Sequence, residues 1–185
     1  MNGFLKNFCR NIAIANYTSS FNVYESEMYM VEAIVQCYER NNSPSIIFVP
    51  ICENSHWTLL IIDVEKRKYF HFNSLKNKTD AGNLKIQRTI EIFSAKKGMK
   101  FDFLNLTHPS QYSTWECGYF VLLASYKYAM GQPMQLSRTI VNNFRKYLLE
   151  ILDKKFEYLF VYKGSILSEF LQRNLGCNFS LAFHV

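Results

Sequence analysis

The sequence predicts a single domain of the α+β class. Its 185 residues are enough for one sizeable apolar core, since 49% of them are hydrophobic and 16% are aromatic. Patterns typical of a helix, strands, a helix, a strand and further helices follow one another along the chain. No repeat and no Gly/Ser-rich linker interrupts this order. We therefore expect residues 1–185 to form one catalytic or binding domain.

Four helices are predicted from apolar periodicity and from capping residues. In residues 24–40 the apolar side chains recur at helical spacing, and the turn-forming sequence NNSP follows. Residues 82–97 are also helical in pattern. Residues 117–130 form a strongly apolar helix that a glycine and a proline end. Ser137 is a suitable N-cap for a long amphipathic helix that continues to about residue 155.

Short runs rich in Ile, Val and aromatic residues predict the strands. Residues 45–51 and 57–64 are bounded by polar turns, which is typical of buried strands. The charged sequence EKRK then predicts a hairpin turn into the strand YFHFN, and residues 101–106 predict one more strand.

The two ends of the chain carry weaker patterns. Residues 1–22 show no firm periodicity. After residue 156 a further helix is expected over residues 166–175, and the final LAFHV is a strand or a loose end.

The charge pattern favours solvent-exposed faces over a nucleic-acid site. The net charge is +6 and the isoelectric point is near 9.0, but the Lys and Arg residues are scattered through turns and helices. We expect no nucleic-acid partner, although an acidic protein partner would use the surplus. No apolar run reaches the length of a membrane span, and the amino-terminal residues lack the apolar region of a secretory signal.

The cysteines indicate a reducing compartment such as the cytoplasm or nucleus. There are five, which is an odd number, and they form no CxxC pair and no Cys/His cluster with zinc-ligand spacing. We expect Cys37, inside a predicted helix, to be a small buried apolar residue.

Cys117 is a candidate nucleophile. A thiol must lose its proton to attack a carbonyl, and a helix N-terminus or a neighbouring imidazolium favours that loss. Cys117 begins an apolar helix, and Gly118 after it allows a close approach by backbone or substrate. Taken alone, a cysteine in this position is more often a core residue.

His56 and Asn73 are candidates for the base and for the residue that orients it. His56 begins the strand WTLLII, after the polar stretch ENS. Asn73 ends the partner strand of the predicted hairpin, where its side-chain oxygen would accept the Nδ1 proton of His56 and fix the ring's tautomer. Separately, His56 is more often structural and Asn73 is more often a turn residue.

Gln111 is a candidate oxyanion donor. It lies six residues before Cys117 on a predicted loop, which can direct its side-chain NH₂ towards a developing oxyanion. Together with the backbone N–H of Cys117 it would form an oxyanion hole, in which one donor is worth about 3 kcal/mol.

The string VPICENSHWTLLIIDVEKRKYFHFNSL, followed later by Gln, five residues and CG, carries a specific resemblance. It resembles the ubiquitin-like-protein-specific proteases, the SUMO-deconjugating cysteine peptidases related to the adenovirus proteinase. The similarity extends over about residues 45–130. It implies a papain-like α+β core in permuted order, His then Asn then Cys, with a central mixed sheet flanked by helices.

The resemblance also implies a role for each site residue. His56 would be the general base and Cys117 the nucleophile. Gln111 would donate to the oxyanion, and Asn73 would be the orienting third member. Most members of the family have aspartate at the position of Asn73, and they often have aspartate at that of Glu116.

The substrate implied by the resemblance is ubiquitin or a ubiquitin-like modifier with a Gly-Gly terminus. Trp57 matches the family tryptophan that covers the channel for the Gly-Gly tail, and Trp115 and Gly118 are expected on the same substrate-binding surface. The predicted reaction is isopeptide or peptide cleavage after Gly-Gly by a monomeric enzyme that needs no metal or organic cofactor.

Three alternatives stay open at this point. They are an acetyltransferase of the same clan, a protease that acts on a viral polyprotein, and a catalytically weak module that binds a modifier. The amino-terminal region also resembles those of bacterial effector and viral members, and the compartment would then be a host cell.

Overall fold

The computed structural model describes residues 11–15, 25–76, 83–108, 110–111, 113, 115–134 and 136–159, with the backbone alone at 25–26 and 151–159. Its helices and strands follow in this order: β1 (Ile12–Ile14), α1 (Glu25–Arg40), β2 (Ile46–Glu53), β3 (His56–Asp63), β4 (Lys68–Phe72), α2 (Leu84–Lys97), β5 (Asp102–Phe103), α3 (Cys117–Ala129) and α4 (Arg138–Leu159).

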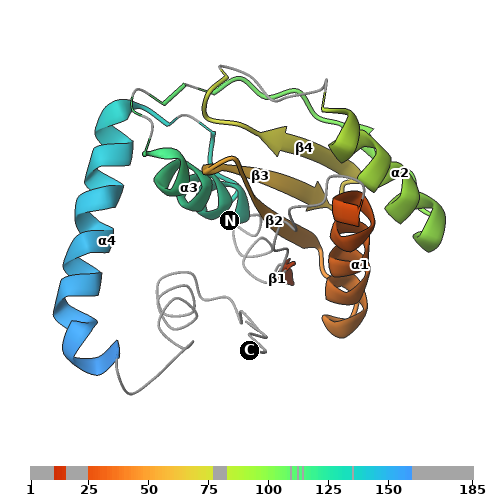
Figure 1. Cartoon of the computed structure of the whole chain (residues 1–185), viewed down its shortest axis with the longest axis horizontal. Coiled ribbons are helices and arrows are strands. Elements are labelled where there is room, and N and C mark those ends of the chain that lie inside the picture. Colours follow the sequence, from red (N-terminus) through yellow and green to blue (C-terminus); the bar gives the residue numbers. More distant parts are fainter. Residues whose placement is uncertain are drawn as a thin grey trace, which may run out of the picture.

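A five-stranded mixed sheet lies at the centre, in the order β1-β2-β3-β4-β5. The two hairpins β2–β3 and β3–β4 are antiparallel, whereas β1 and β5 add to the edges in parallel. Helices α1 and α2 cover one face and α3 covers the other, with α4 outside α3 (Figure 1). These observations confirm the predicted α+β class with a central mixed sheet.

Burial of both faces of the sheet explains the continuous apolar run of β3. Leu60 and Ile62 pack towards α1 and α2, whereas Leu59 and Ile61 pack towards α3. All four side chains are fully buried. A strand between two helical layers needs apolar residues on both sides, so a run without alternation is the expected pattern.

Most of the predicted elements are confirmed within one to a few residues. Asn83 caps α2 by accepting the N–H of Ile86 at 3.2 Å, and the backbone after α2 turns at Gly98 with φ of 61°. The predicted N-cap of α4 is also present, since the hydroxyl of Ser137 accepts the N–H of Ile140 at 3.3 Å.

The two edge strands differ from what the sequence predicted. Strand β1 lies in a segment for which no element was predicted, because three residues are too few for periodicity and pairing with β2 makes them a strand. The strand expected over residues 101–106 is only Asp102–Phe103. Beyond β5 the chain still runs beside β4: the N–H of Leu104 donates to the carbonyl of Tyr69 at 2.7 Å, and the ring centres of His108 and Phe72 lie 4.3 Å apart. The elements expected over residues 166–175 and 181–185 lie outside the described residues.

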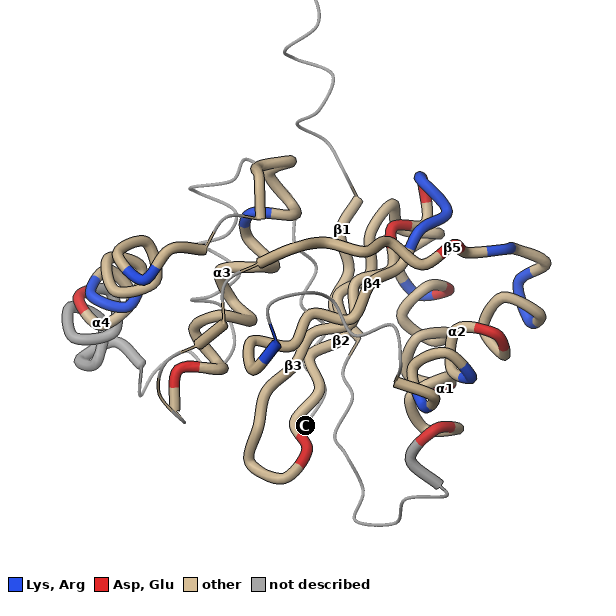
Figure 2. Tube along the Cα trace, turned by 90° about the horizontal axis from the view of Figure 1, so that it is seen from above, with Lys and Arg blue, Asp and Glu red and all other residues tan. Residues whose placement is uncertain are grey.

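The charged residues lie on several separate elements. Figure 2 shows Lys and Arg on α1, on α2, on α4 and at the β3–β4 turn, with Asp and Glu among them. This distribution agrees with the scattered pattern predicted from the sequence.

None of the helices in the described part of the chain is long and apolar enough to cross a membrane.

Asp63 is a buried charge that joins α3 to the sheet. Only 1% of Asp63 is exposed. Its carboxylate accepts the hydroxyl of Tyr128 at 2.7 Å and the backbone N–H of Lys66 at 2.9 Å, and the Lys66 ammonium lies 3.2 Å away. Because a buried carboxylate is costly without partners, these contacts stabilise the packing of α3 on β3.

Replacing Tyr128 by Phe removes one of these hydrogen bonds without opening a large cavity. We expect the free energy of unfolding to fall by about 1.5–3 kcal/mol, the usual worth of a hydrogen bond to a charged group. Urea denaturation measures this loss. Tyr29→Phe is the control, because Tyr29 is 50% exposed. Equal stabilities for both variants would contradict the structural role of Asp63.

Candidate active site

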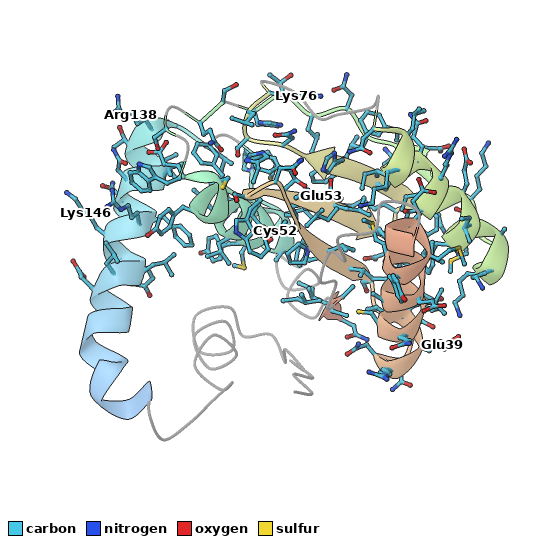
Figure 3. All side chains as sticks on the ribbon, viewed as in Figure 1. Glu39, Cys52, Glu53, Lys76, Arg138 and Lys146 are labelled. Atoms are coloured by element: carbon cyan, nitrogen blue, oxygen red, sulfur yellow. The ribbon has the colours of Figure 1, made fainter. Side chains whose placement is uncertain are left out.

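A tight turn places His56 at the first position of β3. Asn54 and Ser55 connect β2 to β3, and both have positive φ, 50° and 61°. Two consecutive residues with positive φ suit the twist of a two-residue hairpin. Glu53 pairs with His56 across the turn and forms an ion pair with Lys85 of α2. Glu53 marks the end of β2 in Figure 3. The position of His56 is therefore set by both the sheet and α2.

Asn73, the residue after β4, fixes the tautomer of His56. Its Oδ1 lies 2.9 Å from Nε2 of His56 and accepts the backbone N–H of Leu75 at 3.1 Å. A backbone N–H can only donate, so the Asn73 atom that it meets must be the oxygen. Nε2 of neutral His56 must then carry the proton, which leaves Nδ1 as the basic nitrogen. The sequence predicted that Asn73 accepts the Nδ1 proton of His56. The two residues are paired as predicted, but the nitrogen that faces Asn73 is Nε2.

Gln111 is bound to the residue next to Asn73. Its backbone N–H donates to the carbonyl of Ser74 at 2.6 Å. Its side-chain Oε1 accepts the hydroxyl of Ser74 at 2.5 Å. Segments 37 residues apart in the sequence are thereby joined through both backbone and side chain, although only the side chain of Gln111 was singled out in the sequence.

The Gln111 amide has a defined orientation. Its Nε2 donates to the carbonyl of Ser113 at 2.7 Å, and a carbonyl oxygen can only accept. Ser74 donates to Oε1 at the other end of the amide, so the amide oxygen meets a donor and the amide nitrogen meets an acceptor. The N–H of Ser113 in turn donates to the carboxylate of Glu116 at 3.2 Å, and Glu116 is buried. One of the two Nε2 protons of Gln111 is used by Ser113.

Cys117 is the first residue of α3. It is 4% exposed, and the helix that it begins packs against β3. A Cβ atom placed on Gly118 would lie 4.0 Å from Cδ1 of Trp57, the residue after His56. The start of α3 and the start of β3 therefore lie side by side. The first amide groups of a helix have no acceptor within the helix and carry partial positive charge, which favours a thiolate.

The other described cysteines lie on α1 and β2. Cys37 in α1 is buried, as predicted, and burial raises the pKa of its thiol to about 11, although a hydrogen bond from Asn41 lowers it slightly. It is therefore a poor nucleophile at neutral pH. Cys52 lies on β2, opposite Trp57 in the sheet register, and is partly exposed.

Both tryptophans precede α3 in the sequence, and both are exposed. Trp57 is 42% exposed and Trp115 is 53% exposed. The guanidinium of Arg145 on α4 lies 4.4 Å from the centre of the Trp115 ring, and Tyr119 contacts the same ring edge to face. Arg145 was not singled out in the sequence, because an arginine in an amphipathic helix gives no sign of the ring that it stacks on.

Ser74 was also not singled out as a site residue. It occupies a turn-like sequence, FNSLKNK, in which a serine is ordinary. The structure gives it zero exposure and two hydrogen bonds with Gln111.

Among the described residues, no group of three or more His, Cys, Asp or Glu gathers in a way that could hold a metal ion.

The family model described as "Ulp1 protease family, C-terminal catalytic domain" matches residues 24–156. Human sentrin-specific protease 8 is 27% identical over 84 residues, which is 42% of this chain and 40% of that protein. The chain thus spans about two fifths of the length of the first curated relatives that it matches.

Two solved structures illustrate the similarity of fold. The C-terminal Ulp1 protease domain in complex with SMT3, the yeast ortholog of SUMO, superposes with a TM-score of 0.59 at 22% identity, over 73% of this chain and 64% of that one. The Rickettsia bellii effector protein RickCE superposes with a TM-score of 0.55 at 20% identity, over 71% of this chain and 55% of that one.

Proposed function

The chain belongs to the Ulp1 protease family, and we propose that it is a cysteine protease that cleaves after the Gly-Gly terminus of ubiquitin or a ubiquitin-like modifier. The observation that carries this proposal is the hydrogen bond between His56 and Asn73 at 2.9 Å, beside the helix that begins at Cys117. It leaves Nδ1 of His56 as a base, which a nucleophilic thiol requires.

In the first half of the reaction, His56 Nδ1 takes the proton of the Cys117 thiol. The thiolate attacks the carbonyl carbon of the terminal glycine, and the carbonyl oxygen becomes an oxyanion. The backbone N–H of Cys117 and the second Nε2 proton of Gln111 stabilise it. Collapse breaks the C–N bond, and the leaving amine takes the proton from His56. A thioester on Cys117 remains.

In the second half, a water molecule hydrolyses the thioester. His56 Nδ1 removes a proton from the water as it attacks, and the second tetrahedral intermediate uses the same two donors. Collapse releases the modifier's terminal carboxylic acid, which loses its proton to solvent, and the Cys117 thiolate, which takes the proton from His56. No step requires a metal or an organic cofactor.

The proposed substrate channel lies between the start of β3 and the start of α3. A Cβ atom on Gly118 would lie 4.0 Å from the Trp57 indole, at ordinary contact distance, and we propose that an extended peptide tail passes between these two residues. A Gly-Gly tail has no side chains and fits such a passage. Trp115 supplies a second exposed aromatic surface two residues before the nucleophile.

We propose that the enzyme acts as a monomer in a reducing compartment. If the chain is an effector, that compartment belongs to a host cell.

The central test is covalent capture by a modifier with an electrophilic C-terminus. We expect one member of a panel of ubiquitin, SUMO and related proteins to form an adduct with the wild-type chain, because its tail presents the electrophile to Cys117. Intact-mass spectrometry measures the adduct. Cys117→Ala should give none and should also abolish hydrolysis of the matching substrate, a loss of about 10⁶-fold or more when a nucleophile is removed.

The matched control is Cys52→Ala, which removes a partly exposed thiol of the neighbouring strand β2 and should leave adduct formation intact. Hydrolysis retained by Cys117→Ala would overturn the proposal. If no modifier reacts, acetyl-coenzyme A consumption and cleavage of polyprotein peptides distinguish an acetyltransferase from another protease. Binding of a modifier without reaction identifies a non-catalytic module.

The role of Asn73 is tested by two replacements. Asn73→Ala should lower kcat/KM on the order of 10²-fold, because the imidazole loses the contact that fixes its tautomer and orientation. Asn73→Asp should preserve or raise the rate, since a carboxylate also accepts the Nε2 proton. Steady-state kinetics with the captured modifier as a fluorogenic ester or amide measures both.

Leu75→Ala is the control for Asn73. Leu75 is 58% exposed and contributes only its backbone N–H to the site, which alanine retains. Its rate should match that of the wild type. Equal rates for the wild type, Asn73→Ala and Asn73→Asp would show that this residue does not orient His56.

A further inference from the structure

We propose that Ser74 is the positioning residue of the oxyanion hole: its hydroxyl holds the Gln111 side chain with the amide nitrogen directed to the reacting carbonyl. This inference rests on the proposed function and assigns a task to a residue that was not singled out as a site residue in the sequence. It starts from the hydrogen bond that Ser74 Oγ donates to Gln111 Oε1.

Ser74 is well suited to hold an amide in one orientation. It has no exposed surface, so water does not compete for its hydroxyl, and its backbone carbonyl also accepts the N–H of Gln111 at 2.6 Å. Ser74 therefore holds Gln111 by both its backbone N–H and its side-chain oxygen. A glutamine has three side-chain torsions, and without Ser74 only the carbonyl of Ser113 would hold the amide, through Nε2. An amide held at one end has more freedom, so its second Nε2 proton would be directed less well to the developing charge.

The location of Ser74 also couples the two halves of the catalytic apparatus. Asn73 accepts from His56, and the next residue, Ser74, donates to Gln111. The carbonyl of Asn73 accepts the N–H of Lys76 at 3.0 Å, which closes the turn. A single turn after β4 thus sets the tautomer of the base with one residue and the orientation of the oxyanion donor with the next.

The test compares two reactions of Cys117. Hydrolysis forms an oxyanion and requires Gln111, whereas alkylation by iodoacetamide is a direct displacement that forms no oxyanion. Ser74→Ala should lower kcat by about 10-fold with little change in KM. This is less than the 10²–10³-fold that loss of a whole oxyanion donor costs. The rate of Cys117 alkylation, measured by peptide mapping, should stay within about two-fold of the wild type.

A double-mutant cycle distinguishes positioning from general structure. If Ser74 acts through Gln111, Ser74→Ala should have almost no further effect on kcat in a Gln111→Ala background. Asn73→Ala is the contrasting variant, because it should slow hydrolysis and alkylation together. Full additivity of Ser74→Ala and Gln111→Ala, or equal losses in hydrolysis and alkylation, would overturn the proposal.

A second measurement needs no substrate. The side-chain amide signals of Gln111 in a ¹⁵N–¹H correlation spectrum are identified by their loss in Gln111→Ala. In Ser74→Ala they should move towards the shifts of a free glutamine side chain. Unchanged signals would overturn the role of Ser74 whether or not the chain is active. Conversely, shifted signals in a protein that forms no adduct and hydrolyses nothing would support the contact and contradict the proposed function.

Discussion

The site depends on one hydrogen-bonded turn after β4, which carries Asn73, Ser74 and the backbone N–H of Leu75. The Leu75 N–H fixes the Asn73 amide, the Asn73 amide fixes His56, and Ser74 fixes Gln111. In each of these hydrogen bonds only one atom can be the donor and only one the acceptor, so the position of each shared proton is determined. In the proposed mechanism a neutral asparagine suffices, because the task assigned to it is to set the tautomer. The charge of an aspartate would add stabilisation of the imidazolium.

The class of the fold follows from the sequence because the core elements have unambiguous patterns. The continuous apolar run of β3 is what a strand between two helical layers requires, and α3 is apolar enough to be a core helix. The edges of the sheet could not be predicted in the same way. Strand β1 has three residues and β5 has two, and both exist because neighbouring strands offer unpaired backbone groups.

For the site, the sequence indicated His56, Asn73, Gln111 and Cys117 by residue type and order, and their roles stay predictions. The finer arrangement depends on tertiary contacts that no local pattern contains. Nε2 of His56 meets Asn73 across 17 residues. Ser74 meets Gln111 across 37 residues, and Arg145 reaches Trp115 from another helix. Contacts of this kind become visible only when the chain is folded.

A crystal structure of the protein treated with a short peptide aldehyde ending in Gly-glycinal tests the central claim most directly. The aldehyde forms a hemithioacetal with Cys117, whose oxygen occupies the position of the oxyanion. We predict that this oxygen lies about 2.7–3.1 Å from Gln111 Nε2 and from the Cys117 backbone nitrogen, with Ser74 Oγ still bound to Gln111 Oε1. A hemithioacetal oxygen directed away from Gln111, or a Gln111 amide turned with Oε1 towards it, would contradict the account.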